Sequence, residues 1–512
     1  MLPHLGPRHV TGPATVERPT MRPGHHLPFH RRYAFVLALA AITLVGLVVR
    51  LLFAQRWAVP LGLFPGDERF YQYVGVNLAN GDGFTFAVTG VVRSNADHPP
   101  GQTVLHAALS VLGIEGDPSR RAVLAVIVAP AVFLTGLTGR RLGGSAVGLV
   151  AAAIAAAHPL WIQVGPNLWP EGLYLAWISL ALYLAARFRD RPGTALAAGI
   201  GAVIALAGLT RSEGLLFIVV LGGPLVISAV RGWRRRLAMF GAMAGVMALV
   251  LAPWLIRNYQ TFGDFTMSTQ EGDVIAGANC ATVYEGDDLG SFDFDCWIRA
   301  SVINQASGGR LDQQHPDHNP LELAQADRAA GVRYATEHAD RLPIVASARV
   351  LRTWSLFGSG NELVHNATEN RNPTFQQWGQ YVHWFLLPWM VVGSIELLRF
   401  RRSAFVVAFA GVAVTVVTSA IYYGNVRFRV AAEPSIALLA AVGVVAIAAR
   451  LRGGRRHLAS GSEGQVGEHP GAEVGVAGDG GPFGVGNGGV DAAAGEGHER
   501  GEREVEHGGG GG

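Results

Sequence analysis

Hydrophobic residues in this chain gather into long runs that are separated by short polar segments. A helix of about 20 apolar residues crosses the roughly 30 Å hydrocarbon core of a bilayer, and about ten runs approach that length. The pattern predicts an all-α polytopic membrane protein with about ten transmembrane helices. The predicted spans are 33–55, 122–139, 144–163, 170–187, 194–210, 213–230, 237–256, 380–398, 403–422 and 431–449.

Arginines in the connections between these spans indicate their orientation. Short cytoplasmic loops of membrane proteins carry an excess of Lys and Arg. If the N-terminal tail, residues 1–32, is cytoplasmic, every second connection should be rich in arginine, and the sequence has this alternation. Arg50, Arg56 and Arg120–Arg121 are exceptions on the outer side. The clusters on the cytoplasmic side are Arg140–Arg141, Arg187 to Arg191, Arg231 to Arg236, Arg399 to Arg402 and Arg450 to Arg456.

The first outer loop, residues 56–120, contains two stretches with helical periodicity that are too short to cross a bilayer. Apolar residues recur on one side of 68–80, and Gly81 is placed to end that helix. In 102–113 a leucine stripe lies beside a polar stripe. We therefore predict two interfacial helices in this loop. The leucine stripe is Leu105, Leu109 and Leu112, and the polar stripe includes Gln102, His106 and Ser110.

Residues 258–378 form a long segment on the predicted outer side. Helical patterns in 321–340 and 342–357 favour a folded cap, because structureless loops of this length are uncommon. Both cysteines of the chain, Cys280 and Cys296, lie here. An oxidising compartment would allow a disulfide between them, which would stabilise the segment by about 3 kcal/mol in the chain-entropy model. The alternative is a pair of unpaired thiols.

Composition agrees with a membrane protein, since 50% of the 512 residues are hydrophobic, only 15% are charged and the net charge is +3. The first apolar run is too long for a cleaved signal peptide and lacks a small-residue cleavage site. We assign residues 33–257 to an N-terminal transmembrane module that holds the catalytic residues, and 379–450 to C-terminal transmembrane helices. Residues 451–512 are rich in Gly and Glu and are predicted to be a disordered cytoplasmic tail.

Polar residues are scarce in the spans but recur in five outer connections. Ionisable groups inside spans usually mark ion or proton pathways, so their scarcity argues against a coupled transporter. Five polar connections on one side could together line a catalytic cavity. No His, Cys and acidic cluster has metal-site spacing, and we expect no metal or other cofactor. The polar residues are Asp67, Glu68, His98, Asn167, Glu171, Thr210, Arg211, Glu213, Arg257, Asn258, Tyr259, Tyr422, Tyr423, Asn425, Arg427, Arg429 and Glu433.

Several of these residues also have a structural interpretation. Asp67 could cap the helix predicted to begin at residue 68. Glu171 stands at the start of a span, where an acid interacts favourably with the helix dipole. Arg257 could anchor its span at the membrane edge, and His98 could be a solvated loop residue.

The order of several motifs along residues 33–450 resembles the GT-C superfamily of membrane glycosyltransferases. Within it the chain looks like glycosyltransferase family 39, which includes protein O-mannosyltransferases, the lipid A aminoarabinose transferase and bacterial RgtA/B/C/D-like enzymes. The motifs are Asp67-Glu68 with Tyr71, Pro99-Pro100-Gly101, the run from Gly208 to Gly214, the run from Ala252 to Asn258 with Phe262-Gly263, and Arg427-Phe428-Arg429 followed by Glu433-Pro434.

The resemblance implies an enzyme that uses polyprenyl-phosphate-linked sugars on the outer side of the membrane. An Asp in the family's first outer loop is its proposed general base, which implies that role for Asp67, with Glu68 beside it. Some relatives have an Arg three residues after that Asp, where this chain has Phe70, preceded by Arg69. Where the aminoarabinose transferase has a Lys before its proline, this chain has His98. The predicted substrate-binding residues are Tyr71, His98, Glu171, Arg211, Arg257, Asn258, Arg427 and Arg429.

Arg427 and Arg429 stand together before the last predicted span. In an extended segment both guanidinium groups would point to one side and could clamp the donor phosphate. In a helix they would point about 200° apart. The alternatives are that they anchor to lipid headgroups or pair with Glu433.

These observations predict an inverting glycosyltransferase that moves a sugar from a polyprenyl-phosphate donor to an acceptor hydroxyl at the outer face of the plasma membrane. Asp67 would take the hydroxyl proton, and arginines would stabilise the departing phosphate. The acceptor would be a glycan, a lipid or a protein, and no nucleic acid is involved. The alternative is a flippase or exporter of lipid-linked sugars, which would not need Asp67. The sequence identifies neither the sugar nor the oligomeric state.

Overall fold

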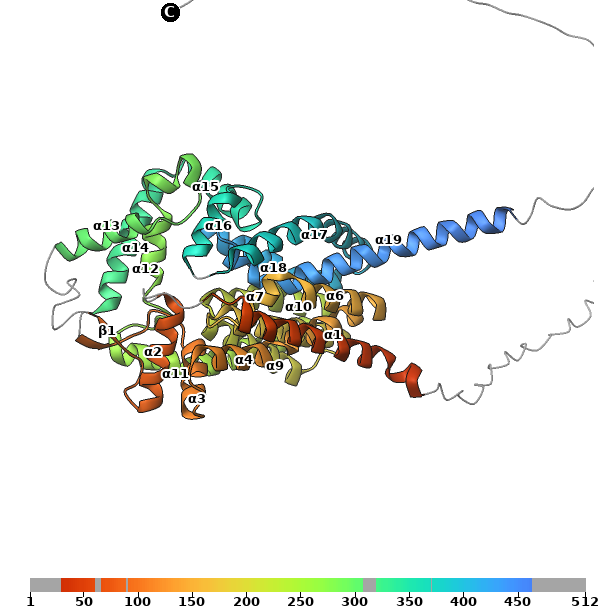
Figure 1. Ribbon diagram of the computed structural model, residues 1–512, viewed down its shortest axis with the longest axis horizontal. Helices are drawn as coiled ribbons and strands as arrows, with labels where there is room; N and C mark the ends of the chain where they lie inside the picture. The colour runs from red at the N-terminus through yellow and green to blue at the C-terminus, as the bar shows by residue number, and fades with distance from the viewer. Residues whose placement is uncertain (1–28, 60–65, 89–90, 307–318, 370, 463–512) are drawn as a thin grey trace, which may run out of the picture. The chain divides into compact units, whose positions relative to one another are not determined.

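The computed structural model describes residues 29–59, 66–88, 91–306, 319–369 and 371–462. Most of this chain is helical, which confirms the predicted polytopic helical fold apart from one short hairpin (Figure 1). Among the described residues, seven helical segments are long and apolar enough to cross a membrane. They are Tyr33–Arg56, Asp117–Gly143, Ser212–Ala229, Trp233–Phe262, Pro373–Phe400, Arg402–Ile421 and Glu433–Arg452.

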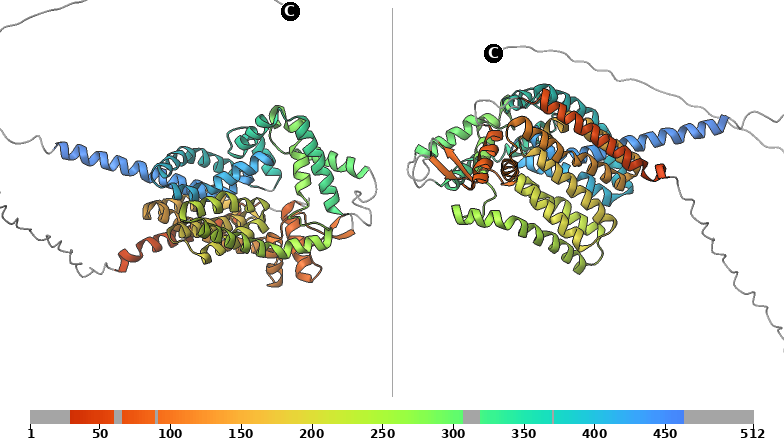
Figure 2. Two further views of the ribbon diagram at one scale, coloured as in Figure 1. Left: turned by 180° about the vertical axis from the view of Figure 1, so that it is seen from behind. Right: turned by 60° about the horizontal axis from the view of Figure 1, so that its bottom comes forward.

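The helices that correspond to the predicted spans lie side by side in one bundle (Figures 1 and 2). Small residues such as Ala151, Ala155 and Ala181 are fully buried in its core and allow the helices to approach closely. The elements are α1 (Phe29–Arg56), α4 (Asp117–Val128), α5 (Pro130–Gly143), α6 (Ser145–Ala157), α7 (Pro159–Val164), α8 (Glu171–Asp190), α9 (Thr194–Thr210), α10 (Gly223–Ala229), α11 (Trp233–Phe262), α17 (Pro373–Phe400), α18 (Arg402–Ile421) and α19 (Glu433–Ser462).

Three of the predicted spans are divided into shorter pieces. The span 122–139 consists of α4 and of α5, which starts at Pro130. The span 144–163 consists of α6 and α7, and His158 between them is extended because a proline follows it. The span 213–230 consists of the 3₁₀ turn η1 (Ser212–Leu216), the π turn η2 (Ile218–Gly222) and α10.

The first outer loop contains both predicted helices, α2 (Asp67–Asn80) and α3 (Gly101–Val111), packed against each other. Gly81 ends α2 as predicted, with the left-handed φ of 93° that glycine adopts at little cost. The buried side of α3 combines polar and apolar residues, because Leu109 of the leucine stripe is only 3% exposed. Gln102 and His106 are fully buried, whereas Leu112, just beyond the helix, is 71% exposed.

A hairpin that the sequence analysis did not predict lies between α2 and α3. Strand β1 (Thr85–Val88) pairs antiparallel with β2 (Val91–Ser94). Strands of four residues are too short for an alternating pattern to identify them. Arg257 of α11 donates hydrogen bonds to the carbonyl oxygens of Asn95 at 2.9 Å and Phe84 at 3.3 Å, and so ties the hairpin to the bundle.

The predicted cap between α11 and α17 is folded, and its helices gather at the same end of the bundle as α2 and α3 (Figures 1 and 2). Helices over 320–337 and 342–353 match two predictions. Cys280 and Cys296 form the predicted disulfide, with a Cα–Cα distance of 6.3 Å, so the alternative of free thiols is wrong. The cap contains α12 (Glu271–Ala278), α13 (Phe294–Ala306), α14 (Pro320–Glu337), α15 (Leu342–Thr353) and α16 (Ser359–Thr368).

At the C-terminus, α19 continues to Ser462, so the predicted disordered tail does not start at residue 451. The part of that tail after Ser462 lies outside the described residues, as do residues 1–28 of the predicted cytoplasmic N-terminal tail, 1–32. The described chain up to Gly454 is one compact unit, and the part from Arg455 onward belongs to a second. The site described next lies entirely within the first unit.

Candidate active site

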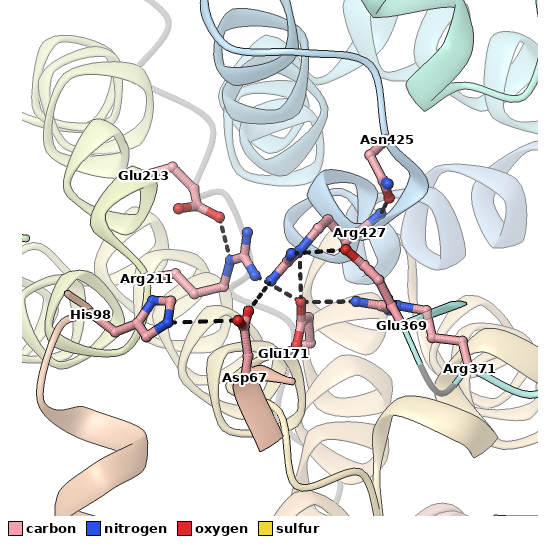
Figure 3. Close-up of polar contacts among 9 residues, drawn as sticks. All are labelled: Asp67, His98, Glu171, Arg211, Glu213, Glu369, Arg371, Asn425 and Arg427. Atoms are coloured by element: carbon pink, nitrogen blue, oxygen red, sulfur yellow. Dashed lines mark hydrogen bonds and ion pairs between the residues drawn. The ribbon is translucent and has the colours of Figure 1, made fainter. Parts of the chain in front are cut away.

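Charged residues from distant parts of the chain meet where the helices end beside the cap (Figure 3). Asp67 is the first residue of α2 and Glu171 the first of α8, while Arg211 directly follows α9. Arg427 lies in the 3₁₀ turn η6 (Val426–Ala431). The site is therefore assembled by tertiary packing of four helix ends or turns.

Local geometry explains how two of these segments are held in place. The Asn425 side chain accepts a hydrogen bond from the backbone N–H of Arg427 at 2.8 Å, which fixes the start of η6. Gly101 begins α3 against the end of α9. A Cβ there would lie 2.8 Å from the Leu209 carbonyl oxygen and from Thr210 Oγ1, so only glycine permits this approach. The contact brings the His98 loop to the end of α9.

Arg427 is the centre of the charged cluster. Its Nη2 lies 3.6 Å from Asp67 Oδ2, its Nε 3.3 Å from Glu171 Oε1, and its Nη1 3.5 Å from Glu369 Oε1. One guanidinium group thus faces three carboxylates, each through a different nitrogen. This fork of fixed donors is specific to arginine, because a lysine ammonium is a single point charge.

Glu171 links the arginines to one another. Its Oε1 accepts from Arg211 at 2.8 Å and lies 3.3 Å from both Arg371 and Arg427. The Glu171 side chain is only 1% exposed. The guanidinium groups of Arg371 and Arg427 also lie 5.0 and 4.9 Å from the Trp169 ring, within cation–π range. A buried carboxylate in this position fixes the arginines relative to one another.

Asp67 borders both a histidine and an arginine. His98 Nε2 lies 3.8 Å from Asp67 Oδ1, too far for a direct hydrogen bond, and its ring packs against Tyr71 and Phe70. Burial lowers the pKa of His98, and Arg427 and Arg211 lower it further, while Asp67 acts in the opposite direction. His98 is therefore a neutral neighbour of Asp67 rather than the cation that the sequence suggested. The Asp67 side chain is 27% exposed.

A cavity of about 450 Å³ opens between this cluster and the cap. Its bundle wall includes Tyr71, His98, Arg211 and Arg427, and its cap wall is formed by α12, α14 and the segment before α12. Asp67 is not itself a lining residue, but its neighbours His98 and Arg427 are. The other lining residues include Thr210, Glu213, Asp264, Phe265, Gln270, Glu271, Leu321, Ala324, Gln325, Arg328, Tyr422 and Tyr423.

Glu68, predicted to act beside Asp67, points away from this cavity. It is 1% exposed and lies 3.5 Å from Arg121. Burial raises the pKa of Glu68 to about 7 against the opposing charges of Arg121 and Arg371. The neighbouring Arg69 pairs with Asp117 at 3.7 Å and does not line the cavity either.

The prediction of an extended arginine clamp is wrong. The segment is the 3₁₀ turn η6, which separates the two side chains. Arg429 is buried, donates to Glu433 Oε1 at 3.0 Å and to Ser355 Oγ at 3.0 Å, and does not line the cavity. The alternative pairing with Glu433 is therefore confirmed for Arg429.

Arg257 and Asn258, two more predicted substrate ligands, have structural partners instead. The Arg257 guanidinium binds main-chain carbonyls of the hairpin region and the Asn258 side chain at 2.9 Å. Asn258 is fully buried and donates to the carbonyl oxygen of Thr266 at 2.8 Å. Neither residue lines the cavity. Both hold the segments that surround it.

Sequence reasoning missed several members of the cluster. Glu369 and Arg371 lie at the end of the long cap segment, where no periodic pattern distinguishes them. Arg371 Nε lies 3.3 Å from Glu369 Oε2. Glu213 lies within a quoted motif, and its Oε1 accepts from Arg211 Nε at 2.5 Å, but a role in the site was not assigned to it.

Comparison with known proteins agrees with the fold. Residues 97–256, which include His98, Glu171 and Arg211, match the family model described as dolichyl-phosphate-mannose-protein mannosyltransferase. Two structures of the archaeal oligosaccharyltransferase AglB from Archaeoglobus fulgidus share the fold. One contains an inhibitory peptide and a dolichol-phosphate, and the other is the apo form. Each is 14% identical, has a TM-score of 0.50 and is matched over 87% of this chain.

The chain resembles the GT-C glycosyltransferases, as its motifs predict. It spans 53% of the AglB chain, about half of its length. A structure of the Saccharomyces cerevisiae Pmt1–Pmt2 complex bound to the sugar donor matches less well, with 18% identity, a TM-score of 0.35 and coverage of 44% of this chain and 34% of that one. A comparison with curated proteins found no significant match. In this GT-C-like fold, Asp67 and Arg427 lie outside the matched family segment.

Proposed function

We propose that the protein is an inverting glycosyltransferase that moves a sugar from a polyprenyl-phosphate donor to an acceptor hydroxyl. One observation carries the proposal: the carboxylate of Asp67 is held by Arg427 beside a cavity that separates the membrane helices from the cap. We infer that a lipid donor enters this cavity from the bilayer and that a polar acceptor enters it from the cap side. The match to a mannosyltransferase family and the dolichol-phosphate in AglB support this donor class.

The reaction is a single displacement. The acceptor oxygen attacks the anomeric carbon while Asp67 takes its proton, and the bond from that carbon to the phosphate oxygen breaks. The polyprenyl phosphate leaves with the bonding electrons, and the anomeric configuration inverts. Of the predicted phosphate ligands, Arg211 and Arg427 line the cavity and can interact with the charge that develops on the leaving group. No cofactor is required by this chemistry.

We place the site on the outer face of the plasma membrane. Arginine-rich connections alternate along the sequence as expected for this orientation. The Cys280–Cys296 disulfide lies in the cap, and disulfides persist in oxidising compartments outside the cytosol. The acceptor is therefore a glycan, lipid or protein that is present outside the cell.

Replacing Asp67 with Asn tests the proposal. The variant keeps the size of the side chain and removes its basicity, and loss of a general base typically lowers turnover about 10²–10⁴-fold. The assay incubates purified protein with a panel of polyprenyl-phosphate sugars and an acceptor extract, and measures release of polyprenyl phosphate. Asp117→Asn is the matched control, because Asp117 also begins a helix and also pairs with an arginine.

The control should keep normal turnover. Normal turnover in the Asp67 variant would exclude Asp67 as the base. A wild-type protein that moves lipid-linked sugars across vesicle membranes but releases no polyprenyl phosphate would instead support the flippase alternative.

A further inference from the structure

The charge of the cavity is distributed unequally between its two walls. On the bundle wall, Arg211 binds Glu171 and Glu213, and Arg427 faces three carboxylates. With Arg371, the cluster holds three guanidinium groups against the four carboxylates of Asp67, Glu171, Glu213 and Glu369. Positive charge on this wall is therefore fully compensated. An incoming phosphate would meet more negative than positive charge there, four carboxylates against three guanidinium groups.

The cap wall provides a cation of a different kind. Arg328 of α14 lines the cavity and is exposed to it. In the described part of the chain it has no hydrogen bond or ion pair, unlike the other two arginines that line the cavity. A guanidinium group without a carboxylate partner can bind an oxyanion without first breaking an existing pair.

Arg328 stands on a rigid support. Leu321, Ala324, Gln325 and Arg328 all line the cavity, and their spacing of three, four and seven residues places them on one face of α14. The helix packs closely against α12. A Cβ at Gly331 would lie 2.5 Å from the Ile275 carbonyl oxygen, so the two helices are in close backbone contact. The guanidinium group is thus presented by a fixed helix rather than by a loop.

We propose that Arg328 forms an anion-binding subsite on the cap wall that holds an oxyanion of a substrate. This inference rests on the proposed function for the identity of the substrates. The same chemistry fits two sources, the phosphate of the lipid donor and a phosphate or carboxylate group on the acceptor. Asp264 and Glu271 also line the cap wall, so it is the unpaired guanidinium group of Arg328, rather than a net positive charge of that wall, that holds the anionic group.

Equilibrium binding to the purified full-length protein tests the subsite without requiring turnover. The probes are farnesyl phosphate, farnesol and inorganic phosphate, each measured in detergent at low and moderate salt. Arg328→Gln removes the charge and Arg328→Lys retains it. Arg333→Gln is the matched control, because Arg333 is on the same helix and exposed but does not line the cavity.

We expect Arg328→Gln to weaken binding of farnesyl phosphate about tenfold or more, the size of one charge-assisted hydrogen bond. Binding of farnesol to the Arg328→Gln variant should not change. Binding of all three probes to the Arg333→Gln variant should not change either. The loss should shrink at higher salt, and the Lys variant should recover part of the affinity.

The probes separate the two sources. A loss confined to farnesyl phosphate assigns the subsite to the lipid donor, and a loss that includes inorganic phosphate, or is confined to it, assigns it to an oxyanion that arrives from water. Equal affinities of the Gln variants at 328 and 333 for both phosphate probes would overturn the inference. Because no sugar is transferred in this experiment, its result is independent of whether Asp67 acts as a base.

Discussion

Two groups of arginines in this protein differ in what they are paired with. The cavity arginines, Arg211 and Arg427, are held by carboxylate side chains at the wall of the cavity. The framework arginines, Arg257, Arg349 and Arg352, donate mainly to main-chain carbonyls. Arg349 binds the carbonyl oxygens of Ala278, Ala420 and Ile421, and Arg352 binds those of Asp287 and Leu289.

This difference shows how functional arginines can be told apart from structural arginines that look alike in the sequence. By donating to several main-chain carbonyls at once, a framework arginine fixes the path of the loop that it binds. A carboxylate is itself ionised and can exchange its arginine for a proton or a substrate. Arginines that are paired with carboxylates at a cavity are therefore candidates for a functional role, and arginines that are paired with main-chain carbonyls have a structural role.

The largest effect that this comparison predicts concerns Arg427. Arg427→Lys should lower turnover about 10²–10³-fold, the range seen when one preorganised donor to a developing charge is lost. A single ammonium cannot face three carboxylates as the guanidinium does. Thermal stability should change little. Turnover per folded molecule and the unfolding temperature in detergent measure the two effects.

Arg429→Lys serves as the control for Arg427. Arg429 lies two residues further in the same turn but is bound to Glu433 and Ser355 away from the cavity. Its substitution should reduce stability and leave the KM for the donor unchanged. Equal losses of turnover in both variants would contradict the idea that the position of Arg427 at the cavity gives it its role.

A second prediction concerns the framework. Arg349→Met should lower the free energy of unfolding by about 3 kcal/mol, because it leaves several buried carbonyl oxygens without a donor. Molecules that remain folded should keep normal KM and turnover. Thermal unfolding and the activity of the folded fraction would be compared with Arg333→Met, an exposed arginine on α14. Unchanged stability with a lower turnover would place Arg349 among the functional arginines.

The features that sequence reasoning predicted correctly are those that depend on local pattern. Long apolar runs identified the bundle, helical periodicity identified α2 and α3, and cysteine content identified the disulfide. The hairpin and the continuation of α19 to Ser462 were not recognised. Four-residue strands carry little pattern, and a composition rich in Gly favoured disorder.

The site was only partly predictable because its members depend on tertiary contacts. Asp67, Glu171, Arg211 and Arg427 were candidates, and the structure brings them together. In the sequence, Arg257 and Arg429 were equally plausible as substrate-binding residues. Only the partners seen in the structure separate them from the arginines of the site. The acidic excess around Arg427 includes Glu369, which lies outside every motif. Pairing across 256 residues between Glu171 and Arg427 leaves no signal in a single sequence.

The smallest predicted effect concerns Glu68, the buried acid behind Asp67. Its pKa of about 7 in the folded protein exceeds its ordinary value of 4.5, because burial outweighs the attraction of Arg121 and Arg371. Between these two values the folded state holds a proton that the unfolded state has lost. The contribution of Glu68 to stability is therefore complete below pH 4.5 and is lost as the pH rises to about 7.

Glu68→Gln removes this titration. Relative to wild type, the variant should gain stability as the pH rises from 5 to 7, with a slope of about 1 kcal/mol per pH unit, and should show no further gain above that range. Unfolding temperatures of both proteins in detergent across this range measure the slope, with the exposed Glu115→Gln as the control. The absence of a slope between pH 5 and 7 would mean that the ion pair with Arg121 dominates and that Glu68 is ionised in the folded protein. Glu68 would then be a negative charge that acts on both Arg121 and Arg371, behind the cluster at the cavity.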